Sequence, residues 1–219
     1  MNEPLLLFTG FEPFGPYPAN ISELLGKRLD GKIVAGYRIR TVILPATISA
    51  DNRGEQLLDL AHRESAVGIL SMGMWSVARE FRIETVARNC MPWNKYCPAF
   101  ANTLISSRYG ADERFYPPLA PWKLPAFKAA CRARARMLPV EISGDAGSFC
   151  CEHLMVQVEI AQRERRCLRR LPFLFIHLPC CPEAISENER DAFTAAGKIF
   201  VTVDEVAEGF ELLLQGATL

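Results

Sequence analysis

The feature that most constrains the fold is an alternation of short apolar runs with amphipathic stretches. Runs of strand length, either continuous or alternating with polar residues, stand at residues 5–11, 37–46, 66–73, 81–89, 140–143 and 172–179. Helical periodicity runs through residues 20–29, 51–65, 125–138, 148–165 and 201–217. Short connections between the two kinds of element indicate a largely parallel sheet covered on both faces. We therefore predict one α/β domain over residues 1–219, with a three-layer α/β/α architecture and a twisted, mostly parallel or mixed central sheet. Only residues 90–124, rich in Pro, Tyr and Trp, follow neither pattern.

The charge balance limits the classes of partner. The chain has 25 Lys and Arg against 25 Asp and Glu, so no net charge recruits nucleic acid or an anionic membrane. We interpret the basic clusters at 131–136 and 163–170 as solvated helix faces. No stretch approaches the roughly 20 apolar residues that span a bilayer, and residues 1–11 do not resemble a cleaved signal. We expect a cytoplasmic protein with neither nucleic-acid nor membrane partners.

The eight cysteines indicate reduced thiols, because disulfides are uncommon in that compartment. None of their spacings is Cys-x-x-Cys, which argues against a zinc site. A metal site formed by Cys150, Cys151 and His153 with the pair at 180–181 is the alternative, although adjacent cysteines are awkward as joint ligands. We expect no metal and no cofactor.

Cys150 and Cys151 fall in the first turn of the helix predicted at 148–165. Partial positive charge at a helix N-terminus lowers the pKa of a thiol and favours the reactive thiolate. A nearby histidine would complete a nucleophile–base pair, and a carboxylate such as Glu84 would orient it. Of the three histidines, His177 ends a buried strand, His153 shares the cysteine helix, and His62 is interpreted as a surface residue. Spacing alone leaves open that both cysteines are only small buried residues.

Four segments in order resemble one known family. FTGFEPFG (8–15), FRIETVARN (81–89), SGDAGSFCCEHLMV (143–156) and FIHLPCCPE (175–183) are similar to segments of the pyrrolidone-carboxylate peptidases, also called pyroglutamyl peptidase I, a family of cysteine peptidases. The resemblance assigns the catalytic carboxylate to Glu84, the nucleophile to Cys151 and the base to His177. Anchoring on the Ala–Gly step at 146–147 leaves Cys150 as a packing residue.

The resemblance implies hydrolysis of the amide bond after an N-terminal pyroglutamyl residue of a small peptide. Phe11 and Phe14 of the GFEPFG loop would pack against the lactam ring, although an ordinary hydrophobic turn explains them too. Asn20, which survives from the family's Asn-Pro pair, is assigned to the substrate side with them. Members of the family often form dimers or tetramers, so a homo-oligomer is expected, with residues 90–124 as candidate contact surface.

Three family features are absent. Asn20 is followed by Ile rather than Pro, a Gly-Arg step is replaced by MGMWSVARE (72–80) with Trp75, and a run that carries a family arginine has no counterpart in 90–100. We hypothesise a divergent member with weak activity or an altered substrate. The alternatives are a cysteine amidohydrolase for another small blocked amide and a non-catalytic ligand-binding homologue.

Overall fold

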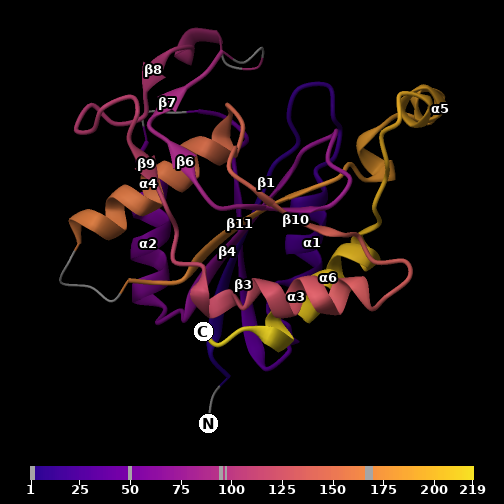
Figure 1. The fold of residues 1–219 in the computed structure, drawn as a ribbon, viewed down its shortest axis with the longest axis horizontal. Coiled ribbons are helices and arrows are strands. Elements are labelled where there is room, and N and C mark those ends of the chain that lie inside the picture. The colour runs from indigo at the N-terminus through magenta and orange to yellow at the C-terminus, as the bar shows by residue number, and fades with distance from the viewer. Residues whose placement is uncertain (1–2, 49–50, 94–95, 97, 166–169) are drawn as a thin grey trace.

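The computed structural model describes residues 3–48, 51–93, 96, 98–165 and 170–219. Their centre is a seven-stranded sheet in the order β10-β5-β11-β4-β1-β3-β2 (Figure 1). Its strands are β1 (Leu5–Phe11), β2 (Ile33–Val34), β3 (Tyr37–Leu44), β4 (Gly68–Met74), β5 (Phe81–Glu84), β10 (Val140–Ser143) and β11 (Phe173–Leu178). Each of the strand-length runs in the sequence therefore contributes a strand.

The direction of the strands changes once inside the sheet. β1 pairs in parallel with β3 and β4, and β4 pairs in parallel with β11. β5 and β10 are parallel to each other, but β5 is antiparallel to β11, and the short β2 is antiparallel to β3 at the edge. The sheet is therefore mixed, as expected, and its internal reversal lies between β11 and β5.

Helices cover both faces and create two cores. Alternate residues of β1 separate them: Leu6 and Phe8 belong to one core, Leu5 and Leu7 to the other, because successive strand side chains point to opposite faces. The first core is covered by α1 (Ile21–Leu29), α3 (Leu124–Arg132) and α6 (Val203–Gly216), the second by α2 (Arg53–Arg63) and α4 (Cys150–Glu164). The three-layer α/β/α prediction is confirmed (Figure 1).

Helix starts follow local capping chemistry. Asn20, rather than Ser22, is the N-cap of α1, and its side chain accepts a hydrogen bond from the Ser22 backbone. Thr202 and Glu205 form a reciprocal capping box at α6, which satisfies two otherwise orphaned backbone donors. Helix α4 differs, because its N-cap is the apolar Phe149, whose side chain provides no capping hydrogen bond.

Several details differ from the sequence predictions. The strand expected over 81–89 ends at Glu84, and the helix expected over 125–138 spans Leu124–Arg132. Helix α5 (Glu187–Ala195) was not expected, since Phe193 is its only buried side chain and it has no apolar stripe; Figure 1 shows it at the periphery. His62 is half-buried rather than on the surface, with its Nε2 atom enclosed.

The described residues of 87–115 form an excursion beside α4. It contains the antiparallel pairs β6 (Ala87–Arg88) with β9 (Arg114–Phe115) and β7 (Cys90–Met91) with β8 (Thr103–Leu104). Four large apolar side chains in the described part of 90–124 are exposed: Trp93, Phe100, Leu104 and Tyr116. A homo-oligomer contact through this segment would depend on these side chains. The homo-oligomer itself remains a prediction. None of the helices in the described part of the chain is long and apolar enough to cross a membrane.

Helix α4 is fixed in place by close approach to α2. A Cβ atom on Gly54 would lie 2.4 Å from the Gln157 carbonyl carbon and 2.4 Å from the Val158 nitrogen. Gly54→Ala should therefore force the helices apart and lower the free energy of unfolding by about 1–3 kcal/mol, as overpacking does. The matched control is Gly216→Ala, where the nearest atom lies at 3.7 Å and no loss is expected. Urea denaturation of both variants checks this, and equal stabilities would contradict it.

Candidate active site

A buried histidine–carboxylate pair spans the strand reversal. Nδ1 of His177 on β11 lies 2.8 Å from Oε1 of Glu84 on β5, and the two side chains are 4% and 0% exposed. Because a carboxylate oxygen accepts hydrogen bonds, Nδ1 of the neutral ring is the donor, and Nε2 is left with the lone pair. The pair therefore presents an oriented base.

Cys151 lies close to His177 on the face of the sheet that α4 covers. Gly73 on β4 is paired with His177 on β11, and a Cβ atom on Gly73 would lie 3.2 Å from Cys151 Sγ and 3.5 Å from His177 Cδ2. The missing side chain of Gly73 thus leaves room for the thiol beside the imidazole. Helix α4 delivers the cysteine there because it packs on the sheet face that also carries Phe175.

The thiol and the imidazole open into one cavity of about 390 Å³. It lies at the carboxyl ends of β1, β4 and β11, where open α/β sheets hold their ligands. Its lining residues are Phe14, Tyr17, Met74, Trp75, Ser76, Val77, Tyr96, Ala146, Gly147, Ser148, Phe149, Cys151, His177 and Lys198. Both cysteines are buried, at 5% exposure for Cys150 and 7% for Cys151, but only Cys151 lines the cavity.

One wall of the cavity is a cluster of aromatic rings centred on Phe14. Its ring centroid lies 5.3 Å from that of Tyr17, 5.6 Å from Tyr96 and 5.7 Å from Phe149. The Tyr17 hydroxyl donates to Ser76 Oγ at 2.9 Å, which ties the loop after β1 to the loop after β4. A flat, weakly polar group entering the cavity therefore meets rings held in position by one another.

The direction of the Cys151 pKa shift differs from the sequence prediction. Cys151 does stand in the first turn of α4, but its pKa is raised well above the usual value by interaction with the Cys150 thiol, by burial, and by the negative charges of Glu84 and Glu152. These effects outweigh the helix terminus, so the expectation of a lowered pKa is wrong. A base that removes the proton would favour the thiolate at this site, and the adjacent imidazole is positioned to do so.

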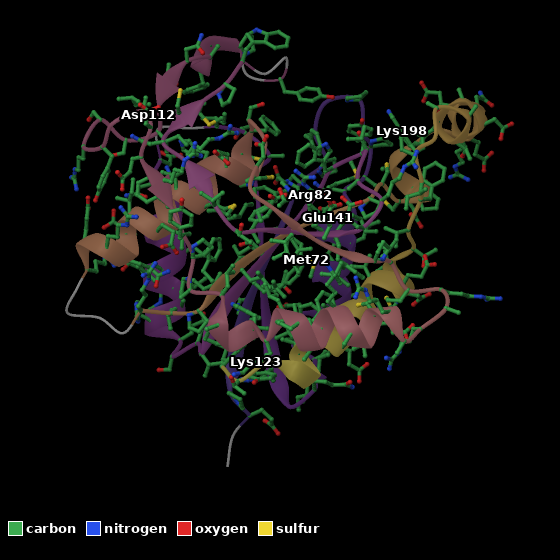
Figure 2. The ribbon with its side chains drawn as sticks, viewed as in Figure 1. Met72, Arg82, Asp112, Lys123, Glu141 and Lys198 are labelled. Atoms are coloured by element: carbon green, nitrogen blue, oxygen red, sulfur yellow. The ribbon has the colours of Figure 1, made fainter. Side chains whose placement is uncertain are left out.

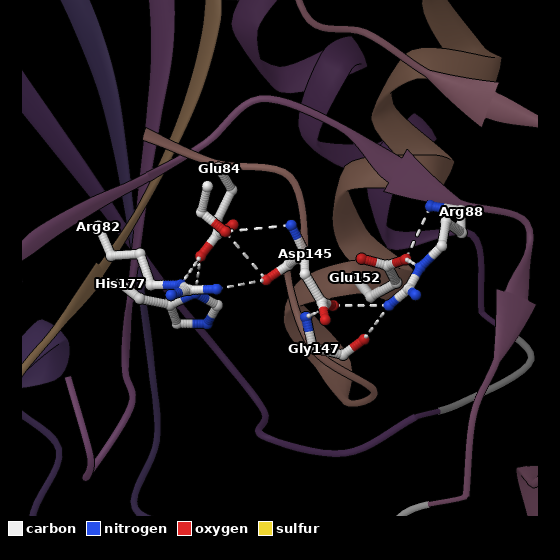
Figure 3. Close-up of polar contacts among 8 residues, drawn as sticks. Arg82, Glu84, Arg88, Asp145, Gly147, Glu152 and His177 are labelled. Carbon is white, nitrogen blue, oxygen red and sulfur yellow. Dashed lines mark hydrogen bonds and ion pairs between the residues drawn. The ribbon is translucent and has the colours of Figure 1, made fainter. Parts of the chain in front are cut away.

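A second polar network holds the turn before the nucleophile. The Arg88 guanidinium donates to Asp145 Oδ1 at 2.6 Å and to the Gly147 carbonyl at 3.3 Å, and it also donates to Glu152 Oε1 at 3.3 Å. The pKa of Glu152 is raised to about 7, chiefly by burial, and Arg88 opposes that rise. Figure 3 shows this network beside the Glu84–His177 pair. It fixes residues 145–147 against the first turn of α4.

Other residues singled out in the sequence lie apart from the cavity. Phe11 is buried behind it, with its ring 6.2 Å from that of Phe175, and Asn20 is occupied by capping α1 and by donating to the Glu12 carbonyl. Of the three proposed substrate-binding residues, only Phe14 lines the cavity. His153 is not a lining residue, and burial lowers its pKa to about 4.

The cysteine pairs proposed for a metal belong to opposite sides of the sheet. Cys180 and Cys181 lie in the core under α1, α3 and α6, whereas Cys150 and Cys151 lie in the core under α2 and α4. Within the described ranges, no group of three or more His, Cys, Asp or Glu side chains is arranged to hold an ion. The separation of the two pairs removes the geometric basis of the alternative metal site.

The sequence did not predict that Arg88, Tyr96 and Arg82 belong to this site. Arg82 donates to Glu84 Oε1 at 3.1 Å. The signal for it was present, because strand alternation places residues 82 and 84 on the same face. Tyr96 carried no such signal, since it lies in the irregular segment 90–124, where neither strand nor helix periodicity predicts what a side chain faces.

Comparison with known proteins assigns the chain to a family. A model of the pyroglutamyl peptidase family matches residues 5–203. The chain belongs to the pyroglutamyl peptidase family. A pyrrolidone-carboxylate peptidase of Mycobacterium tuberculosis is 30% identical over 96% of this chain and 92% of its own length. One of Coprothermobacter proteolyticus is 28% identical over 94% of this chain and 98% of its own length.

Solved structures of pyroglutamyl peptidases share the fold. Pyroglutamyl peptidase I from Bacillus amyloliquefaciens superposes with a TM-score of 0.79 at 19% identity, covering 99% of this chain and 96% of that one. Pyrrolidone carboxyl peptidase from Thermococcus litoralis gives 0.78 at 19% identity, covering 98% and 93%. The resemblance first noted in four short segments therefore extends to the architecture of the whole sheet and its helices.

The lowered pKa of His153 predicts a pH-dependent stability. Its usual pKa of 6.5 falls to about 4 in the folded protein, so below pH 6.5 the unfolded chain binds the proton first and stability is lost as the pH falls toward 4. Between pH 7 and 4.5, wild type should lose about 1–2 kcal/mol more than His153→Gln, after allowance for partial solvent exposure. Denaturation curves across this range measure it, and parallel pH dependences for the two proteins would contradict it.

Proposed function

We propose that this member of the pyroglutamyl peptidase family hydrolyses the amide bond that follows an N-terminal pyroglutamyl residue of small peptides. The observation that carries the proposal is the meeting of three groups at one cavity. The Cys151 thiol and the His177 imidazole both line it, and Glu84 is bonded to the far side of the imidazole at 2.8 Å. This is the arrangement of nucleophile, base and orienting acid that acyl transfer needs.

The reaction follows from the positions of these groups. His177 Nε2 takes the thiol proton, and Cys151 Sγ attacks the pyroglutamyl carbonyl carbon to form a C–S bond. Collapse of the tetrahedral intermediate breaks the C–N bond, and His177 gives its proton to the leaving amine. Water, deprotonated by His177, then attacks the thioester; the C–S bond breaks, pyroglutamate leaves and the thiol regains its proton. Glu84 stabilises the imidazolium at each transfer.

The start of helix α4 is suited to stabilise the oxyanion. The first N–H groups of a helix have no partner within the helix, and the Phe149 N-cap supplies no side-chain acceptor for them. They adjoin Cys151, so a carbonyl carbon bonded to Sγ would place its oxygen near them. Preorganised donors of this kind usually provide the largest electrostatic contribution to acyl transfer.

Binding of the lactam ring is assigned to the aromatic wall. Phe14 lines the cavity with its ring supported by Tyr17, Tyr96 and Phe149, and an uncharged five-membered ring suits such a surface. Phe11 supports the wall from behind through Phe175, and Asn20 holds the loop through its bond to the Glu12 carbonyl. We therefore propose direct substrate contact for Phe14, with indirect roles for Phe11 and Asn20.

A second candidate is hydrolysis of a different small blocked amide by the same three groups. It is favoured by Trp75, a bulky side chain that lines the cavity in the turn where the sequence departs from the family pattern. A panel of aminomethylcoumarin amides with varied acyl groups separates the two candidates, because the preferred acyl group should be turned over fastest at low substrate concentration.

We also propose a cytoplasmic location. The described cysteines at positions 90, 131, 150, 151, 180 and 181 are free, and catalysis by Cys151 requires a thiol rather than a disulfide. A reducing compartment maintains that state. Localisation of a fluorescent fusion by microscopy checks this, and an extracytoplasmic signal would contradict it.

The roles of the two adjacent cysteines are tested by release of aminomethylcoumarin from its pyroglutamyl amide. Cys151→Ala should lose at least about 10³-fold in kcat/KM, the scale seen when a nucleophile is removed. Cys150→Ala is the matched control: the Cys150 thiol does not line the cavity, so activity should be retained, and because that thiol raises the pKa of Cys151, the rising limb of the pH profile should move to lower pH. Equal losses in both variants would contradict the assignment of Cys151.

The aromatic wall is tested with Phe14→Ala. Loss of this ring should raise KM for the pyroglutamyl substrate by about tenfold, the scale of a lost apolar contact in a pocket, because the ring contributes to binding and not to proton transfer. Tyr116→Ala, at an exposed site with 59% of its surface accessible, controls for removal of an aromatic ring. A Phe14→Ala enzyme with unchanged KM and reduced kcat would contradict a binding role.

A further inference from the structure

Arg82 stands directly beside the histidine and the acid in the sheet. In the antiparallel register between β5 and β11, Arg82 pairs with His177 and Glu84 pairs with Phe175. Directly opposed residues and residues two apart share one face of a sheet. Arg82, Glu84 and His177 therefore emerge on the same face, which helix α4 covers. Figure 2 places Arg82 near the middle of the molecule, whereas Asp112 lies at the periphery.

One carboxylate oxygen of Glu84 accepts hydrogen bonds from both Arg82 and His177. Arg82 Nε donates to Oε1 at 3.1 Å, and His177 Nδ1 donates to the same atom at 2.8 Å. The other oxygen, Oε2, is buried without a hydrogen-bond partner among the described residues. Arginine and histidine thus share one acceptor, and this carboxylate is fully buried. Charge-assisted hydrogen bonds in such surroundings are stronger than exposed ones.

Two further contacts hold the guanidinium in place. Its central carbon lies 4.5 Å from the centroid of the Trp75 ring, a cation–π distance, and Nη2 donates to the Asp145 carbonyl at 3.2 Å. The same Trp75 ring meets His177 edge to face, with centroids 5.0 Å apart. Arg82 is therefore stacked on a ring that touches His177. It is also hydrogen-bonded to Glu84 and to the Asp145 carbonyl in the turn before Cys151, as Figure 3 shows.

We infer that Arg82 is a positioning residue of this site: stacked on Trp75, it shares the Glu84 oxygen with His177 and offsets the negative charge that Glu84 directs at the base and the nucleophile. Its role in catalysis rests on the proposed function. Its action on the reactivity of Cys151 is measurable without turnover of a peptide.

The charges around the Cys151 thiol determine in which direction loss of Arg82 should move its pKa. Glu84 from β5 and Glu152 from α4 both disfavour the thiolate, as does the adjacent Cys150. Arg88 is bonded to Glu152 and to Asp145, and Lys198 lines the far part of the cavity. Arg82 is the cation bonded to Glu84. Removing it leaves that carboxylate uncompensated, so the thiolate should form at higher pH.

The test is the pH dependence of Cys151 alkylation by iodoacetamide, read by mass spectrometry, alongside that of kcat/KM. In Arg82→Gln the rising limb of both profiles should move to higher pH by about one unit, as loss of a nearby charge does. Arg82→Lys keeps the charge and should restore most of the wild-type profile. Arg136→Gln, at an exposed arginine, controls for the substitution itself. A purely structural role for Arg82 would lower rates without moving the profile.

A separate variant covers the case in which Arg82→Gln does not fold. Trp75→Leu removes the stacking partner but leaves the arginine, and it should move the same limb in the same direction by a smaller amount. Superimposable profiles for wild type and for the folded variants would overturn the inference. Wild type without turnover of pyroglutamyl amides would refute the proposed function instead, and the alkylation profiles would still decide the role of Arg82.

Discussion

The hydrogen bond between Glu84 and His177 depends on the antiparallel pairing of β5 with β11. This is the one reversal of strand direction in the interior of the seven-stranded sheet. A parallel neighbour for β11 would offset the two strands differently and would not place residues 82 and 84 beside residues 175 and 177 as the antiparallel register does. The reversal therefore brings a carboxylate from β5 under an imidazole from β11, and the direction of β11 brings that imidazole to the cavity edge.

Burial of Glu84 shapes the rest of the site. A carboxylate with no solvent exposure is costly unless it accepts hydrogen bonds, and here the imidazole and the Arg82 guanidinium both donate to its Oε1 atom. The pKa of the Cys151 thiol is raised by the Cys150 thiol, by burial, and by this negative charge together with that of Glu152. A base beside the thiol, such as His177, suits a mechanism in which proton removal and attack are coupled.

Much of this was predictable from the sequence, and the limits have physical causes. The apolar runs 5–11 and 172–179 predicted β1 and β11 because buried strands need little context. The nucleophile, base and acid came from resemblance to the pyroglutamyl peptidases, and the structure brings Glu84, Cys151 and His177 together. The predicted direction of the Cys151 pKa shift was wrong: the largest cause, the Cys150 thiol, is the adjacent residue in the sequence, but its contact with Cys151, like the burial and the nearby carboxylates, is set by tertiary packing. Tyr96 reaches the cavity through an irregular segment that no periodicity describes.

The central claim is that Glu84 and His177 act as one unit on Cys151. The most direct measurement is a double-mutant cycle in kcat/KM on pyroglutamyl-aminomethylcoumarin, with wild type, Glu84→Gln, His177→Asn and the double variant. Residues that act as a unit are strongly non-additive, so we predict that the double variant loses little more than His177→Asn alone. Losses that multiply would show that the two residues contribute independently, which would contradict the claim.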